Sequence, residues 1–65
     1  MQTTFDTVAV GQEFKWGIYT LTKIDDSYYP KNIPLHKRKP NCINNENNHK
    51  CVLGRKVIVE VDRIR

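Results

Sequence analysis

The chain has 65 residues, of which 38% are hydrophobic and 28% charged, and it carries a formal net charge of +4. A chain this short forms one domain with a small core, because it buries only about 60% of its unfolded surface. It has little room for a substrate cleft of roughly 300 Å³ or more. It also contains no Gly-rich phosphate loop, H-E-x-x-H or G-x-S-x-G motif. We therefore expect a protein that is not an enzyme.

The amino-terminal segment, MQTTFDTVAVGQEF, has no basic region followed by an apolar one, so it does not resemble a signal peptide. No apolar run in the chain approaches the roughly 20 residues of a membrane span. We therefore expect a cytoplasmic protein of the host cell with no membrane partner. In that compartment a persistent disulfide is disfavoured.

Residues 12–24 have the pattern of a β-hairpin. Gly11 can adopt a positive φ before the first strand, and Gly17 marks the turn between the two strands. The second strand is rich in β-branched and aromatic residues. Its alternation leaves open which face is buried. One face carries Tyr19, Leu21 and Lys23, and the other carries Ile18, Thr20, Thr22 and Ile24.

Residues 30–50 lack a strand or helix pattern, because Pro30, Pro34 and Pro40 interrupt the segment. A loop of about 20 residues in so small a domain is usually functional or disordered. Residues 31–56 also carry seven Lys or Arg side chains against Glu46, a net charge of +6. We predict a long, inserted, basic loop whose charge suits an anionic partner.

The end of the chain predicts one more strand, because Val57, Val59 and Val61 alternate with other residues. The LGRK sequence at 53–56 predicts a turn, with a short strand over 51–53 before it. The fold class that follows is all-β: a single small domain spanning residues 1–65, built as an SH3-like barrel or as an antiparallel meander of four or five strands with a long inserted loop.

The opening half of the chain resembles a group of small phage- and prophage-encoded accessory proteins. The resemblance lies in Phe5, Val8, Val10-Gly11 and Phe14, followed by Tyr19 and Lys23, which read F-x-x-V-x-V-G-x-x-F…Y-x-x-x-K. The valine-rich KVIVEV at 56–61 is similar to the end of such proteins. The resemblance implies a small SH3-like barrel and a phage accessory role. It carries over no catalytic residues, and the 30–50 segment departs from the pattern.

All four cysteine and histidine residues lie close together in the sequence, at His36, Cys42, His49 and Cys51. Four nitrogen and sulfur ligands suit tetrahedral Zn²⁺, but the spacing lacks a Cys-x-x-Cys knuckle. A Cys42–Cys51 disulfide would close a loop of roughly ten residues and stabilise a small domain. A third possibility is two free thiols with surface histidines, and a protein that needs no cofactor.

Three binding functions remain open at this point. The first is a host or defence protein as partner, which the chain would bind and modulate, most simply by inhibiting it. The second is single-stranded nucleic acid, because aromatic rings can stack on bases while basic side chains contact phosphates. The third is a zinc-stabilised binding domain. The candidate partner-binding or nucleic-acid-binding residues are Tyr28, Tyr29, Lys31, Lys37, Arg38, Lys39, Lys50, Arg55 and Lys56, with Trp16 as a further candidate for stacking.

Overall fold

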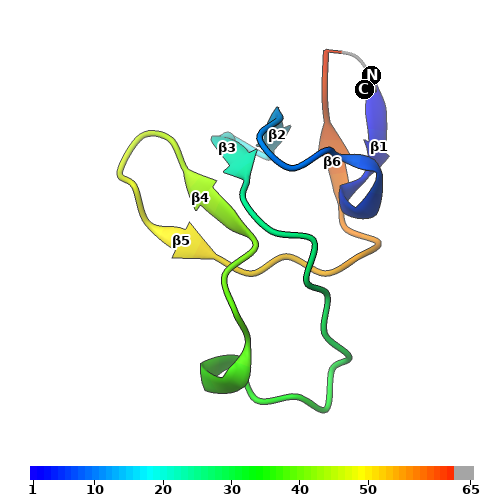
Figure 1. The fold of residues 1–65 in the computed structure, drawn as a ribbon. Coiled ribbons are helices and arrows are strands. Elements are labelled where there is room, and N and C mark those ends of the chain that lie inside the picture. The colour runs from blue at the N-terminus through cyan, green and yellow to red at the C-terminus, as the bar shows by residue number, and fades with distance from the viewer. Residues whose placement is uncertain (63–65) are drawn as a thin grey trace.

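The computed structural model describes residues 1–62, which form one antiparallel β-sheet of six short strands (Figure 1). The described residues contain no α-helix, only two short 3₁₀ turns. The strands are β1 (Gln2–Thr4), β2 (Glu13–Trp16), β3 (Tyr19–Lys23), β4 (Cys42–Asn44), β5 (Lys50–Cys51) and β6 (Ile58–Glu60), and the 3₁₀ turns are η1 (Phe5–Thr7) and η2 (Leu35–Lys37).

The strand order in the sheet is β1-β6-β2-β3-β4-β5. Strands β2 to β5 follow one another as an antiparallel meander, and β6 returns to lie between β2 and β1. The all-β prediction is therefore confirmed, with six strands instead of four or five. The sheet is not closed into a barrel, because β1 and β5 lie at its two ends.

The prediction of a loop over 30–50 is wrong for the second half of that segment, which forms the β4–β5 hairpin. The irregular connection instead runs from residue 24 to residue 41, with η2 within it, and loops away from the sheet in Figure 1. The hairpin depends on asparagine, which tolerates turn conformations that most residues resist. Asn48 has a φ of 61°, and the Asn44 carbonyl accepts a 2.8 Å hydrogen bond from its backbone N–H.

Gly11 has the positive φ that the sequence predicted, and Gly17 lies in the predicted turn, also with a positive φ. Gly17 (φ 61°) and Ile18 form the two-residue turn between β2 and β3, in which Trp16 pairs with Tyr19. Glycine is favoured at the first of these two positions, where a side chain would be strained. Gly11 (φ 90°) precedes β2, and its N–H donates to the Lys23 carbonyl at 2.7 Å.

The hydrophobic core lies on one face of the sheet, at the end that η1 and the segment before β6 cover. Phe5 from η1 packs on Phe14 of β2 with 5.3 Å between ring centroids. Val59 and Val61 are buried and Val57 is half-buried, as the alternating valines predicted. The buried hydrophobic residues are Phe5, Val8, Phe14, Leu21, Cys42, Leu53, Val59 and Val61.

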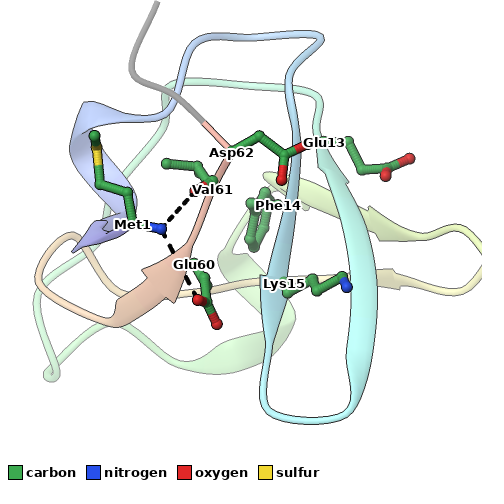
Figure 2. Close-up of a pocket in the computed structure, with 7 residues that line it drawn as sticks. All are labelled: Met1, Glu13, Phe14, Lys15, Glu60, Val61 and Asp62. Carbon is green, nitrogen blue, oxygen red and sulfur yellow. Dashed lines mark hydrogen bonds and ion pairs between the residues drawn. The ribbon is translucent and has the colours of Figure 1, made fainter.

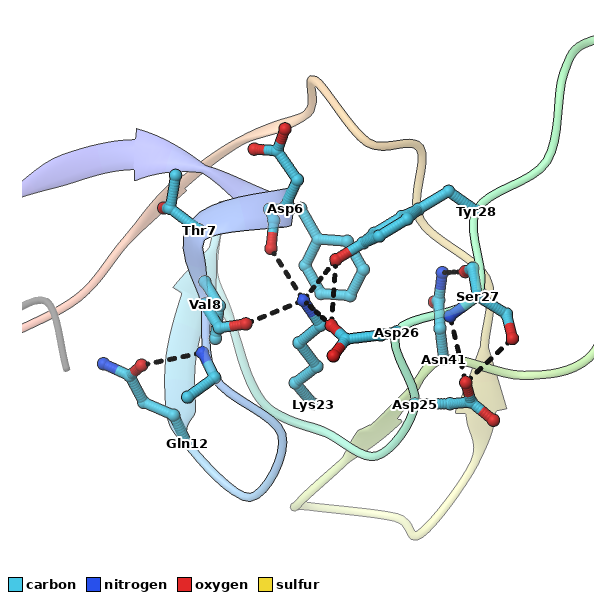
Figure 3. A network of polar contacts seen from close by, with 12 residues as sticks. Asp6, Thr7, Val8, Gln12, Lys23, Asp25, Asp26, Ser27, Tyr28 and Asn41 are labelled. Carbon is cyan, nitrogen blue, oxygen red and sulfur yellow. Dashed lines mark hydrogen bonds and ion pairs between the residues drawn. The ribbon is translucent and has the colours of Figure 1, made fainter.

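The buried face of β3 is the one that carries Leu21 and Lys23, so a lysine lies in the core with none of its surface exposed. Its ammonium group is surrounded by acceptors, which Figure 3 shows. The Val8 carbonyl accepts at 2.7 Å and the Phe5 carbonyl at 3.3 Å. The Asp26 carboxylate lies at 2.7 Å, and the Tyr28 hydroxyl also bonds to the ammonium. A buried charge is tolerated only when it is paired and hydrogen-bonded in this way.

Asn41 is the second fully buried polar side chain, and it joins the end of the long connection to the segment before β6. Its amide donates to the Ser27 and Leu53 carbonyls, both at 2.9 Å. Its carbonyl oxygen accepts from the Leu53 N–H, also at 2.9 Å. Among the described residues, no buried side-chain polar atom is left without a partner.

We predict that Lys23→Met lowers the free energy of unfolding by about 2–4 kcal/mol, because it leaves buried carbonyls and Asp26 without their cation. Urea denaturation of the two proteins measures the difference. Asp26→Asn is the matched control. That carboxylate is 69% exposed, and the Phe5, Val8 and Tyr28 oxygens still accept from the ammonium without it, so its loss should cost less than the loss of the ammonium. Equal stability of the Lys23→Met variant and the wild type would contradict a central role for this ammonium.

Stability should also depend on pH at both extremes. Hydrogen bonds from Lys23 and Tyr28 hold the pKa of Asp26 below its ordinary value of 3.8. Its stabilising effect is therefore complete above pH 3.8 and is lost as pH falls through the folded-state value. Burial opposes the charge of Lys23, but bonds to Asp26 and Tyr28 outweigh it and raise its pKa above 10.5. That stabilisation should be lost only as pH rises above 10.5.

Unfolding free energies measured across the acidic range test this expectation, with Asp26→Asn as the comparison. The Asn variant should lose less stability than the wild type as the pH falls below 3.8. Parallel curves for the two proteins would show that Asp26 does not couple folding to protonation.

Candidate binding surface

The face of the sheet that forms the core continues beyond it, and residues 1–62 leave this face uncovered at the end nearest the β2–β3 turn. Phe14 pairs with Leu21 in the core, and Trp16 pairs with Tyr19 two residues further along the same face. Phe14 and Leu21 are almost fully buried, whereas Trp16 is 40% and Tyr19 44% exposed. The apolar face therefore ends at two exposed aromatic rings.

This uncovered end of the sheet forms an open groove of about 340 Å³, which we call the hairpin groove. Its aromatic wall is the Trp16–Tyr19 pair, whose ring centroids lie 6.1 Å apart at an interplanar angle of 33°. Ile18, at the turn beside this pair, is 86% exposed. The residues that line the groove are Trp16, Tyr19, Leu21, Asn44, Asn47, His49 and Cys51.

The opposite wall of the groove is the β4–β5 hairpin, whose turn is held by its own asparagines. The Asn44 side chain accepts from the Glu46 N–H and the Asn47 side chain from the His49 N–H, both at 2.9 Å. The Asn44 N–H donates to the His49 carbonyl at 2.8 Å. These bonds place two amide groups and an imidazole opposite the two aromatic rings.

The turn is also fastened to β2 and β3 through Asn45. Its backbone N–H donates to the Thr20 carbonyl at 3.0 Å, and its side-chain oxygen accepts from the Thr22 hydroxyl at 2.9 Å. Its amide donates to the Glu13 carboxylate at 3.1 Å. The two walls of the hairpin groove are thus joined on the far face of the sheet.

The chemistry of this groove suits a neutral, partly apolar ligand. Among the described residues, no Lys, Arg, Asp or Glu lines it. The two rings and Leu21 offer apolar surface, and the two amides can both donate and accept hydrogen bonds. Tryptophan and tyrosine are also, with arginine, enriched at the energetic centres of protein interfaces.

Three of the predicted site residues do come together, in a second hollow that we call the tyrosine pocket. It is lined by Tyr28, Tyr29, Pro30 and Arg55 and has a volume of about 290 Å³. The Arg55 guanidinium lies over the Tyr28 ring, 5.3 Å from its centroid. Tyr28 also packs edge-on against Phe5 and bonds to Lys23, so it serves the core as well as this pocket.

The other predicted basic residues do not share one site. Arg38 is used internally, since its guanidinium donates to the Ile33 carbonyl at 2.9 Å and the Pro30 carbonyl at 3.2 Å. Lys56 forms an ion pair with Asp6 at 3.5 Å. The side chains of the remaining four are exposed on the long connection and on β5: Lys31, Lys37, Lys39 and Lys50.

The predicted zinc ligands are brought together only in part. Cys42 and Cys51 pair across β4 and β5, with 2.7 Å between their sulfur atoms. His36 lies in η2, and His49 is exposed in the hairpin groove. Within residues 1–62, no three His, Cys, Asp or Glu side chains form a group that could hold a metal ion. The structure therefore gathers a dithiol but no four-ligand zinc site.

A third hollow, of about 310 Å³, lies where β2 and β6 diverge after their single paired position at Lys15 and Glu60. Figure 2 shows the Met1 ammonium group directed toward Val61 and Glu60 at its edge. The ammonium donates to the Val61 carbonyl at 2.9 Å and lies 3.9 Å from the Glu60 carboxylate. These contacts join the residue before β1 to the end of β6, its neighbour in the sheet.

Comparison with known proteins finds no match, whether to a family model, to a curated protein or to a solved structure. Within residues 1–62, the structure has no helix with the length and apolar character to span a membrane.

The sequence did not predict the hairpin groove as a site, although it indicated one of the residues that line it. Trp16 was a candidate for stacking, but Tyr19, Asn44 and Asn47 were not predicted as site residues. The signal that could have found Tyr19 is its pairing with Trp16 across the Gly17 turn. That pairing places two large rings at the exposed end of a short hairpin.

Proposed function

We propose that this chain is a non-catalytic binding protein that attaches to another protein through the hairpin groove. The observation that carries the proposal is the uncovered end of the core face, where Trp16 and Tyr19 stand exposed beside Leu21. An apolar face continuous with a core is stabilised when another molecule covers it. The neutral lining favours a polypeptide segment that inserts an apolar side chain between the rings and the amides.

The resemblance of residues 5–23 to phage and prophage accessory proteins supports a host or defence protein as the partner. Such a partner would be modulated by occupation of its surface. Inhibition is the simplest outcome of attachment, and the host cytoplasm is the place that this role implies.

We predict that a Trp16→Ala, Tyr19→Ala double variant loses the partner while staying folded. Both rings are partly exposed, so their removal should weaken binding at least about 10-fold, as for residues at the centre of an interface. Affinity capture from a bacterial lysate identifies candidates, and calorimetry with each purified candidate gives the dissociation constant.

Leu35→Ala is the matched control, because Leu35 is 70% exposed and lies in η2, away from the groove residues in the sequence. This variant should bind as the wild type does. Unchanged affinity of the double variant, or equal losses in both variants, would place the contact surface elsewhere.

Nucleic-acid binding is the second candidate, and the tyrosine pocket is the observation that favours it. Two tyrosines and an arginine meet there, which combines ring surface with a positive charge. The exposed Lys31 follows Pro30 directly in the chain. The hairpin groove does not support this function, because no cation lines it among the described residues.

Fluorescence anisotropy with single- and double-stranded oligonucleotides tests the second candidate. If it is correct, log K should fall linearly with log salt concentration, and Arg55→Ala should reduce the slope by about 1. Lys15→Ala, on an exposed β2 residue outside the tyrosine pocket, should leave the slope unchanged. Absence of binding to both kinds of oligonucleotide at low salt would exclude nucleic acid as the ligand.

A further inference from the structure

The two cysteines of the chain face each other directly across the β4–β5 hairpin. Cys42 and Cys51 are register partners, and their sulfur atoms lie 2.7 Å apart. Partners in an antiparallel pair have Cα atoms about 4.5–5.5 Å apart. That separation falls within the roughly 4.4–6.8 Å that a disulfide requires. Both residues are free thiols in this structure.

We propose that Cys42 and Cys51 form a covalent modification site, at which a small-molecule disulfide such as oxidised glutathione converts the two thiols into a cross-strand disulfide. The two sulfur atoms already lie closer than two unbonded sulfurs ordinarily approach, so bond formation needs little movement of either strand. This site does not depend on the proposed partner, because the reaction concerns these two side chains and a soluble thiol reagent alone.

Two exchange steps complete the reaction. In the first, the thiolate of one cysteine attacks a sulfur of oxidised glutathione, whose S–S bond breaks, and one glutathione leaves as a thiolate that takes up a proton. In the second, the other cysteine loses its proton and attacks the mixed disulfide, which releases the second glutathione. The two protein thiols are oxidised, and one glutathione disulfide is reduced to two glutathione thiols.

The surroundings of the two thiols set their order of reaction. Cys51 is half-buried and lines the open hairpin groove, so glutathione can reach its sulfur. Cys42 has no exposed surface, and burial followed by the hydrogen bond with Cys51 raises the pKa of its thiol far above the ordinary 9.0. Cys51 is therefore the attacking thiol and Cys42 the resolving one, because the reagent can reach the Cys51 sulfur from the groove and cannot reach the buried Cys42 sulfur.

The same two thiols fit a metal site less well than they fit a disulfide. Soft ions such as Cu(I) bind thiolates, but the structure supplies only two of them, and no third His, Cys, Asp or Glu joins the group within residues 1–62. The direct pairing of the two sulfurs matches a covalent bond between them better than a shared ion.

Intact mass spectrometry of the full chain tests the proposal. The protein is incubated with excess oxidised glutathione, quenched with acid, unfolded and treated with an alkylating reagent. The oxidised protein should lose two hydrogens and take up no alkyl group, whereas the reduced protein should take up two. A treated protein that still takes up two alkyl groups, or that forms dimers on a non-reducing gel, would overturn the proposal.

Two single variants test the order of the steps. Cys42→Ala should stop at a stable glutathione adduct on Cys51, because the resolving thiol is absent. Cys51→Ala should react at least about 10-fold more slowly, because its remaining thiol is buried. Equal rates for the two variants would contradict the assignment of Cys51 as the attacking thiol.

The melting temperature gives a readout that does not depend on the variants. A disulfide that closes a loop of roughly ten residues should raise it by about 10 °C or more above that of the reduced protein, by constraining the unfolded chain. A lower melting temperature in the oxidised protein would show that the bond strains the hairpin and that the native geometry does not favour it.

Discussion

The described structure depends on one buried cation, the ammonium group of Lys23. This group binds the Phe5 and Val8 carbonyls at the start of the chain and Asp26 and Tyr28 at the start of the long connection. It thereby holds η1 and Phe5 over the sheet and fastens the chain where it leaves β3. Without these acceptors the charge would be too costly to bury, so the cation and the backbone around it are stable only together.

This anchor lies at the end of the sheet where residues 1–62 cover the core face. Phe5, Leu53 and the residues around them cover the end near Lys23 and Asn41. The end near the β2–β3 turn receives no such cover from the described residues, and the hairpin groove is the result. The groove is thus a direct consequence of where the small core is built.

Those parts of the fold that depend on local pattern could be predicted from the sequence. Alternating valines located β6, and Gly11 and Gly17 located the ends of the first hairpin strand. The β4–β5 hairpin could not be found in this way, because its strands are short and its turn is formed by side-chain bonds from Asn44 and Asn47 instead of glycine. The burial of Lys23 was equally hidden, since two of its acceptors are backbone carbonyls that no sequence pattern identifies. The groove combines residues from four strands and the turn between β4 and β5, so it exists only once the register is set.

The bonds of Asn45 to Thr20, Thr22 and Glu13 have a consequence for how the groove would meet a ligand. They join the asparagine turn to the β2–β3 hairpin, so the aromatic wall and the amide wall are fastened to each other before any ligand binds. A ligand that enters between them therefore orders few new torsions in the protein. Binding usually costs conformational entropy, because loops and side chains of the protein become ordered. Here folding has already ordered the backbone of both walls, so less of the favourable contact energy is offset by this cost. An exposed asparagine on the far side of the sheet would in this way contribute to the affinity of a groove that it does not touch.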